Sequence, residues 1–433
     1  MKWRIMVAIC LVFMLTGCMR KTDTLDDNPY IVKVMYYSAS SFMNEVGERF
    51  MAEHPNVLID VIPFPRFLDS NQQRAAFRDL IHQDRPDLIF LTANIDGFRE
   101  RIAEGVLLEL DSLIQDDQDL RSHYHPGILN AIRTYGNGSI YGLASTFNRS
   151  GIYYNTEIFH ERNASLPANQ MNWSELIAMA RQFKGAVNAS GQPIIGLYMP
   201  EHSSIFSVIS EYAATEQLYL TNPSRGLLFD QPSWRTIVTE VITGLREGYI
   251  LIPGIGSAHD ESSQVDFNDG TIAMMLGDSQ YLGVIEDVDW DVVTEPVHKS
   301  HPDSAHHLRI HLYGIHKETQ VLPAAWELLK SIIRSESEAF PDNKSLLYAY
   351  KPKSDQVNEY KQEPFYQFQD LLELPEEAVS QEFKDPFAAM AEQYLRETVS
   401  GKLDIDTAIQ HIQSEGQRLW LSEMSDEEEG MDE

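Results

Sequence analysis

The chain has little cysteine and little positive charge. Its 433 residues include two cysteines, and 34 Lys plus Arg stand against 65 Asp plus Glu, for a net charge of −31. A negative field of this size repels phosphate backbones, so nucleic acid is not an expected partner. The sequence also lacks any run of about 18 apolar residues, the length that a transmembrane helix needs.

Short catalytic motifs are missing as well. The sequence contains no G-x-x-x-x-G-K-[ST] phosphate loop, no H-E-x-x-H zinc motif and no G-x-S-x-G nucleophile elbow. Asp287, Asp289 and Asp291 alternate, but the Gly and Glu that a calcium loop requires do not follow them. We therefore expect no catalytic residues and no cofactor.

The first residues predict export. Lys2 and Arg4 precede an apolar run at 5–15. At 1.5 Å per residue this run would span about 16 Å as a helix, roughly half a bilayer, which is typical of a secretory signal peptide. The run ends in LTGC at 15–18, which resembles the bacterial lipobox, whose cysteine is lipidated after cleavage before it. An ordinary secretory signal with an incidental cysteine is the alternative.

Cleavage after a signal peptide at 1–17 would leave Cys18 as the only cysteine of the mature chain. No intrachain disulfide could then form. Stable anchoring takes more than one acyl chain, which we expect Cys18 to carry. The polar stretch 18–29 reads as a flexible tether. We expect the mature protein to be held on the extracytoplasmic face of the cell membrane.

Apolar periodicity predicts alternating strands and helices from residue 30 onward. Strands are expected at 31–37, 57–62 and 86–91, and helices at 42–53, at 71–83 and from the third strand to about 103. This order predicts a parallel, doubly wound α/β sheet with helices on both faces. Ligands of such sheets bind beyond the carboxyl ends of the strands, which points to the loops 38–41 and 92–96.

The second half of the chain carries clear helix boundaries. Asn172 is a predicted N-cap with Glu175 at the third helical position, and a helix at 232–247 is closed by Gly248. An amphipathic helix is expected at 406–421. The acidic segment 423–433 that follows is predicted to be a solvated, disordered tail.

Six segments in order resemble the bacterial extracellular solute-binding proteins of family 1, the sugar-binding subunits of ABC importers. Three of them begin with PDLIF at 86–90, SIYGL at 139–143 and NWSEL at 172–176. The full segments cover 86–114, 139–159, 172–183, 266–282, 314–333 and 400–412. The resemblance therefore extends over most of the chain behind the lipobox-like sequence.

The resemblance implies a periplasmic-binding-protein-like fold of type II. Two doubly wound α/β lobes would be joined by crossover hinge strands, with the ligand in the cleft between them and closure by hinge motion. The implied boundaries are 30–147 plus 315–352 for the N-terminal lobe, 150–312 plus 356–422 for the C-terminal lobe, and crossovers near 146–150, 309–314 and 350–352.

The resemblance and the strand ends together give a set of expected ligand-binding residues. They are Ser38, Ser40, Ser41, Asn94, Asp96, Asn148, Arg149, His202, Ser203, Asp278, Ser279, Tyr281, Arg309 and Tyr313. Local structure offers alternatives: turn or helix-cap chemistry explains the serines and the pair at 94–96, and an ion pair explains Arg149. The family often carries Trp where this sequence has Tyr281.

Six histidines lie between 298 and 316. Clustered histidines invite a zinc interpretation, but Arg309 lies among them and no cysteine supports a site, so we expect no metal. On a strand, Arg309, His311 and Tyr313 would share a polar face directed into the cleft.

These observations predict a lipid-anchored, monomeric binding protein. It would capture a small solute, for which a sugar, and in particular an oligosaccharide, is the expectation, and deliver it to the ABC permease subunits in the membrane. One alternative is a carbohydrate-active surface enzyme, which needs two carboxylates about 5–9.5 Å apart. The other is a subunit that presents its ligand to a sensor kinase.

Overall fold

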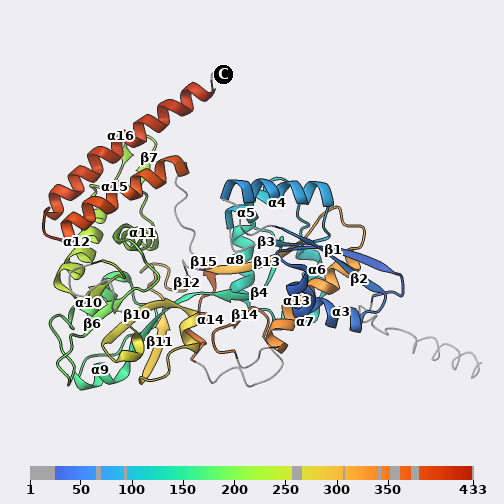
Figure 1. Ribbon diagram of the computed structural model, residues 1–433, viewed down its shortest axis with the longest axis horizontal. Helices are drawn as coiled ribbons and strands as arrows, with labels where there is room; N and C mark the ends of the chain where they lie inside the picture. The colour runs from blue at the N-terminus through green and yellow to red at the C-terminus, as the bar shows by residue number, and fades with distance from the viewer. Residues whose placement is uncertain are drawn as a thin grey trace, which may run out of the picture. The chain divides into compact units, whose positions relative to one another are not determined.

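The computed structural model describes residues 25–64, 70–91, 95–255, 266–305, 308–339, 343–351, 361–371 and 380–431. The chain is mixed α/β and divides into two compact units (Figure 1). Unit 1 comprises Met1–Phe90, Val106–Leu108 and Tyr313–Ile332, and unit 2 comprises Leu91–Gly105, Glu109–Leu312 and Ile333–Glu433. The lobe boundaries expected above remain predictions, and Cys18 and Asn94 lie outside the described residues.

Unit 1 is built on parallel strands. Its elements are β1 (Tyr30–Tyr36), α2 (Ala39–Phe42), the π-helical turn η2 (Met43–Gly47), α3 (Glu48–Glu53), β2 (Val57–Pro63), α4 (Ser70–Asp84), β3 (Leu88–Leu91), the end of β13 (Arg309–Ile315) and the start of α13 (Leu322–Ala339). β1 lies between β3 and β2 and pairs with both in parallel. In β1, the exposed Ile31 and Lys33 alternate with Val32 and Val34, which are fully buried. The predicted β-α-β-α-β arrangement is confirmed.

The segment after β1 differs from the expected loop. Ser38 caps α2, because its side chain accepts a hydrogen bond from the Ser41 backbone N–H at 3.3 Å. A loop at 38–41 was therefore the wrong prediction, since a serine at the end of a strand serves equally well as a helix N-cap. The helix continues through η2 and α3, and it buries Phe42, Val46 and Phe50 as the periodicity predicted.

A five-stranded mixed sheet organises unit 2. Its order is β11-β5-β10-β6-β9, formed by β11 (Trp290–Thr294), β5 (Ser150–Asn155), β10 (Ile272–Asp278), β6 (Ile195–Tyr198) and β9 (Ile250–Leu251). β5 is antiparallel to β10 and β11, whereas β6 is parallel to β10 and β9. The carboxyl ends of β6 and β10 therefore meet at one edge of this sheet.

Helices cover this sheet with an apolar core. They are α9 (Thr156–Glu161), α10 (Trp173–Arg181), α11 (Ile205–Thr215) and α12 (Pro232–Glu247). α10 begins with the predicted capping box of Asn172 and Glu175, and α12 ends at Gly248 with φ 75°. Trp173 is fully buried, stacks on Tyr212 at 5.3 Å and donates its indole N–H to the Thr215 hydroxyl at 3.1 Å. Both predicted helix boundaries are confirmed.

Unit 2 also contains an antiparallel strand pair outside the five-stranded sheet. β14 (Leu347–Tyr348) pairs antiparallel with β4 (Leu143–Asn148), so Leu347 lies opposite Phe147. The other elements are α5 (Ile95–Ala103), α6 (Asp111–Asp116), α7 (Gln118–His123), α8 (Pro126–Tyr135), β7 (Thr221–Asn222), β8 (Gly226–Leu227), η3 (Phe267–Asp269), η4 (Ser279–Gly283), β12 (Ser304–Ala305), α14 (Glu363–Tyr366) and β15 (Asp370–Leu371).

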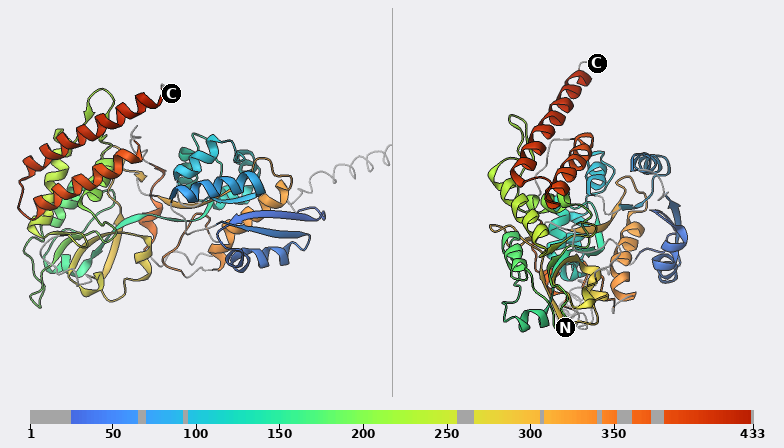
Figure 2. Two further views of the ribbon diagram at one scale, coloured as in Figure 1. Left: turned by 45° about the horizontal axis from the view of Figure 1, so that its top comes forward. Right: turned by 60° about the vertical axis from the view of Figure 1, so that its left-hand side comes forward.

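Two long helices end the chain. α15 (Gln381–Val399) and α16 (Ile405–Met431) lie side by side, as Figures 1 and 2 both show. α16 continues to Met431, so the acidic run at 425–430, expected to be a disordered tail, is helical instead. Glutamate is a good helix former, and a helix that is already nucleated extends through such residues at little cost. In the described part of the chain, no helix is both long and apolar enough to span a bilayer.

Candidate functional site

Polar side chains gather where strands of unit 2 end. Asp278 is the last residue of β10, and Glu201 follows β6, the parallel neighbour of β10. Asn148 ends β4, and one residue separates it from β5, whose Ser150 lies opposite Asp278 in the antiparallel register. Strand pairing therefore brings together groups that lie between 77 and 131 residues apart in the sequence.

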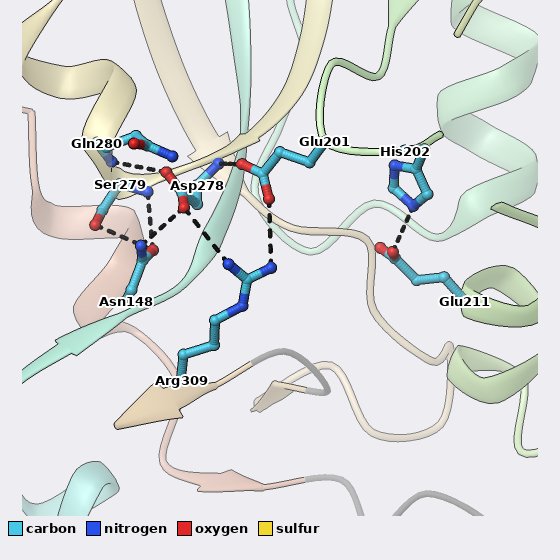
Figure 3. Close-up of polar contacts among 8 residues, drawn as sticks. All are labelled: Asn148, Glu201, His202, Glu211, Asp278, Ser279, Gln280 and Arg309. Carbon is cyan, nitrogen blue, oxygen red and sulfur yellow. Dashed lines mark hydrogen bonds and ion pairs between the residues drawn. The ribbon is translucent and has the colours of Figure 1, made fainter. Parts of the chain in front are cut away.

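A hydrogen-bond network fixes these groups, as Figure 3 shows. Asn148 Nδ2 donates to Asp278 Oδ2 at 2.8 Å, and Asn148 Oδ1 accepts from the Ser279 N–H at 3.1 Å and from its hydroxyl at 3.2 Å. The Gln280 N–H donates to Asp278 Oδ1 at 2.9 Å, which caps the 3-10 helix η4. Asp278 and Ser279 are 2% and 1% exposed, so the network is held rigidly inside unit 2.

Arg309 extends the network toward solvent. Its guanidinium lies 3.6 Å from Glu201 Oε2 and 3.9 Å from Asp278 Oδ2, while Glu201 Oε1 accepts from the Asp278 backbone N–H at 2.7 Å. The Arg309 side chain is 52% exposed, whereas that of Glu201 is 21% exposed. One exposed guanidinium thus lies over two ordered carboxylates, and most of its N–H donors remain available to a solute.

Aromatic rings flank the same strand end. The Tyr153 hydroxyl donates to the Asp278 backbone oxygen at 2.7 Å, and the ring of Tyr281 meets that of Tyr153 edge-on at 6.0 Å. A Cβ on Gly277 would lie 2.7 Å from the Tyr281 ring, so a residue without a side chain is needed there. Burial raises the pKa of Tyr281 to about 12, so the phenol stays protonated at neutral pH and can donate a hydrogen bond.

His202 and Ser203 lie in the loop before α11. His202 Nε2 is 2.8 Å from Glu211 Oε2, and no described residue is a partner for its buried Nδ1. Ser203 is exposed, and its neighbour Ser204 caps α11 by accepting from the Ser207 N–H. In Figure 3 the pair of His202 and Glu211 is separate from the network around Asp278.

Arg149 is fully buried beside the network. Its guanidinium lies over the rings of Phe368 at 5.1 Å and Phe147 at 5.7 Å, and one N–H donates to the Phe365 carbonyl at 3.4 Å. Burial lowers its pKa to about 10, while the buried carboxylate of Glu295 opposes that shift. Arg149 is thus enclosed by aromatic rings and a backbone carbonyl, and both its ligand contact and the alternative ion pair remain predictions.

Ser38, Ser40, Ser41 and Tyr313 are the expected residues in unit 1, which also contains a cluster of aromatic rings, whereas Asp96 belongs to unit 2. Ser38 Oγ and Ser40 Oγ are 3.0 Å apart, and Ser38 also caps α2 at Ser41, so local structure already engages them. Asn94 lies outside the described residues, and Asp96 lies in the first turn of α5.

Tyr313 belongs to the aromatic cluster itself. Its ring lies 5.0 Å from Phe90 and 6.4 Å from Tyr36, and Tyr37 lies 4.1 Å from Tyr36. The rings therefore collect at the carboxyl end of β1 and on β3, where ligands of parallel sheets bind. Tyr36, Tyr37 and Phe90 were not among the residues expected from the sequence. The apolar runs that predict β1 and β3 end at these residues, and that was the available signal.

No metal centre is apparent in the described ranges. Groups of three or more His, Cys, Asp or Glu side chains with metal-ligand geometry do not occur there. His298 and His301 form a pair with their Nδ1 atoms 3.1 Å apart. His306 and His307 lie outside the described residues. Arg309 and His311 are exposed as predicted for one face of the strand, but Tyr313, predicted to share that polar face, is buried among aromatic rings.

The parallel βαβ unit and the mixed sheet give an α/β fold of two compact units, and solved MalE-like proteins share this fold. The family model described as "Bacterial extracellular solute-binding protein" matches residues 37–339, and the chain belongs to this family. The family is extracellular, which implies an extracytoplasmic location, and its members are binding proteins. No curated protein matches the chain.

Solved structures share the fold at low sequence identity. A sugar-binding protein MalE from Xanthomonas citri is 15% identical, with a TM-score of 0.64 over 92% of this chain and 99% of that one. A sugar transporter from Rhizobium etli in an open conformation is 16% identical, with a TM-score of 0.63 over 90% and 99%. An ABC substrate-binding protein from Listeria monocytogenes, in complex with cycloalternan, is 17% identical, with a TM-score of 0.54 over 90% and 99%.

Proposed function

We propose that this chain is the membrane-anchored solute-binding protein of an ABC importer and that its solute is an oligosaccharide. Family membership supports solute capture. Among proteins of the same fold, the one from Listeria monocytogenes is in complex with cycloalternan and others are described as sugar-binding. Cys18 would carry the lipid anchor, and the permease subunits would receive the solute from a monomeric protein that closes by hinge motion.

The network around Asp278 carries this proposal. It combines an exposed guanidinium, two carboxylates, an amide and a hydroxyl within one ordered group. Neighbouring sugar hydroxyls both donate and accept, so they are matched by donors and acceptors that alternate. A strongly anionic solute would need several cations, and this group contains only Arg309 as a cation, opposite Glu201 and Asp278.

Aromatic side chains support the same ligand class. Tyr281 in unit 2 and Tyr37 in unit 1 are partly exposed and offer ring surface, whereas the neighbouring Phe90 and Tyr313 are buried. A ring packs against the apolar face of a sugar while hydrogen bonds fix the hydroxyls at its edge. We therefore propose Arg309 and Tyr281 as solute contacts. Asp278, expected from the sequence to touch the ligand, is only 2% exposed, and we propose instead that it positions Asn148 and Arg309.

A thermal-shift screen with mature protein tests the proposal. Sugars, amino acids and peptides are each added, and a solute at 100 times its Kd should raise the free energy of unfolding by about 2.7 kcal/mol. Arg309→Gln should reduce the shift given by a hit, whereas Arg121→Gln, an exposed arginine on α7, should not. A hit only among charged amino acids, or equal shifts in both variants, would reject the proposed solute class or this site.

The rival carbohydrate-active enzyme makes a different prediction. Asp278 accepts a hydrogen bond from an N–H group at each of its oxygens, and Glu201 accepts from a backbone N–H. Such contacts hold carboxylates as acceptors and support binding without bond cleavage. Incubation with oligosaccharides followed by chromatography of the products separates the two, because shortened products would refute the binding-only proposal.

A further inference from the structure

A depression in unit 1 lies at the opposite edge of the parallel sheet from the strand ends discussed above. Its volume is about 870 Å³, within the range of small-molecule sites. It is lined by the first residues of β1, by the turn before β3 and by the segment between β13 and α13. All of its lining residues belong to unit 1.

Arg85 is held in a strained backbone conformation at this depression. Its φ is 46°, in the left-handed region, and the residue that follows it is Pro86. Its side chain is 70% exposed and lies 3.5 Å from Glu318, which is itself 56% exposed. An exposed pair of this kind contributes little to stability, so the guanidinium can exchange Glu318 for a ligand at little cost.

Two further donors line the same depression. Lys33 Nζ donates to the Asp84 backbone oxygen at 3.2 Å. His316 is 8% exposed, and its Nδ1 accepts from the Glu318 backbone N–H at 3.1 Å. This contact places the imidazole proton on Nε2, and burial lowers the pKa of the ring, so His316 is neutral with a single N–H left to donate.

The carboxylates of the depression fall into two kinds. Asp87 is structural, because Oδ1 accepts from the Thr319 hydroxyl at 2.6 Å and Oδ2 accepts from the Lys33 backbone N–H at 2.9 Å. Asp84 and Glu318 also line the depression, and their carboxylates do not accept hydrogen bonds at both oxygens as that of Asp87 does. The depression therefore offers cationic donors together with the carboxylates of Asp84 and Glu318, the latter in an exposed ion pair with Arg85.

We propose that this depression binds a small zwitterion. Its oxyanion would contact Arg85, Lys33 and His316, and its ammonium group would contact Glu318 and Asp84. A simple anion fits less well, because Asp84, Asp87 and Glu318 outnumber the two cations and the whole chain carries −31. The proposal concerns a second site and does not depend on the identity of the transported solute.

Two sources carry this chemistry, a free peptide or amino acid and the headgroup of a zwitterionic phospholipid. Calorimetric titration of the mature protein with glycylglycine and with sn-glycero-3-phosphoethanolamine distinguishes them. At least one of the two should bind saturably, and at least tenfold more tightly than inorganic phosphate or ethanolamine does. If the headgroup binds, vesicles that contain phosphatidylethanolamine should compete with it.

Variants test the site without threatening the fold. Arg85→Asn removes the guanidinium but keeps a residue that tolerates the left-handed region, and it should weaken binding at least fivefold. Glu318→Gln should weaken the zwitterion more than phosphate. Arg225→Asn, at an exposed arginine in a turn of unit 2, is the matched control and should leave the affinity unchanged.

Three results would overturn the proposal. They are no saturable binding up to 10 mM of either zwitterion, equal binding of phosphate, and indifference to Arg85→Asn. Competition by the sugar identified in the thermal-shift screen would also overturn it, because the two sites would then be one. A failed sugar screen leaves this titration unaffected.

Discussion

Exchange of the two side chains at the centre of the network tests whether the network is built as described. In Asp278→Asn, the new amide must keep an oxygen toward the Gln280 N–H, which turns its NH₂ group toward the NH₂ group of Asn148. Two donors then face each other. In the double variant Asn148→Asp/Asp278→Asn, the direction of that hydrogen bond is reversed, while the new carboxylate still accepts from Ser279.

The magnitude follows from these contacts. A hydrogen bond to a buried carboxylate contributes about 1.5–3 kcal/mol. Attraction between Arg309 and Asp278 at 3.9 Å adds less than about 1 kcal/mol, because the guanidinium is half exposed and screened by solvent. We expect Asp278→Asn to lower the free energy of unfolding by about 2 kcal/mol. Asn148→Asp should also be destabilising, since it places two carboxylates in contact.

Chemical denaturation followed by circular dichroism measures these differences. The double variant should recover the stability of the parent to within about 1 kcal/mol, which gives a coupling energy of opposite sign to the single effects. Ser414→Ala, which removes an exposed hydroxyl on α16, serves as a neutral control. Additive losses in the double variant would show that Asn148 and Asp278 do not form the described pair.

Three further predictions concern anchoring, binding and pH. Cys18→Ala should release the protein from membranes or leave it unprocessed, with unchanged solute affinity; membrane retention of a fully processed variant would contradict the anchor. A neutral sugar should bind with nearly equal affinity at low and physiological ionic strength, and Tyr281→Ala should weaken it by about 1–3 kcal/mol; calorimetry at two salt concentrations would expose a charged solute instead. His125, whose pKa burial lowers to about 4, takes up its proton more readily when unfolded, so stability should fall by about 1–2 kcal/mol as the pH drops from 6.5 to 4.5. His125→Gln should flatten that part of the pH–stability curve, and an unchanged slope would show that another group is responsible.

Local signals in the sequence sufficed for much of the fold. The alternation of Val32 and Val34 with exposed residues marks β1, and the Asn172 and Glu175 box marks the start of α10. These features depend on residues close in the chain, where side-chain periodicity and capping act directly. The serines after β1 were expected in a loop, because helix caps and loops have similar compositions. The acidic run at 425–430 was expected to be disordered because of its charge, but α16 continues through it.

The sequence could predict individual residues of the site but not the contacts between them. The sequence placed Asp278 at the end of an apolar strand and Asn148 at an expected crossover, but it did not indicate that one donates to the other across 130 residues. Likewise, nothing local distinguishes Arg149, which tertiary packing buries completely, from Arg309, which it leaves half exposed over two carboxylates. The sequence alone determined which residue types stand at the strand ends. Only the tertiary structure decided which of them are buried, paired or open to a solute, because burial and pairing depend on contacts between distant segments.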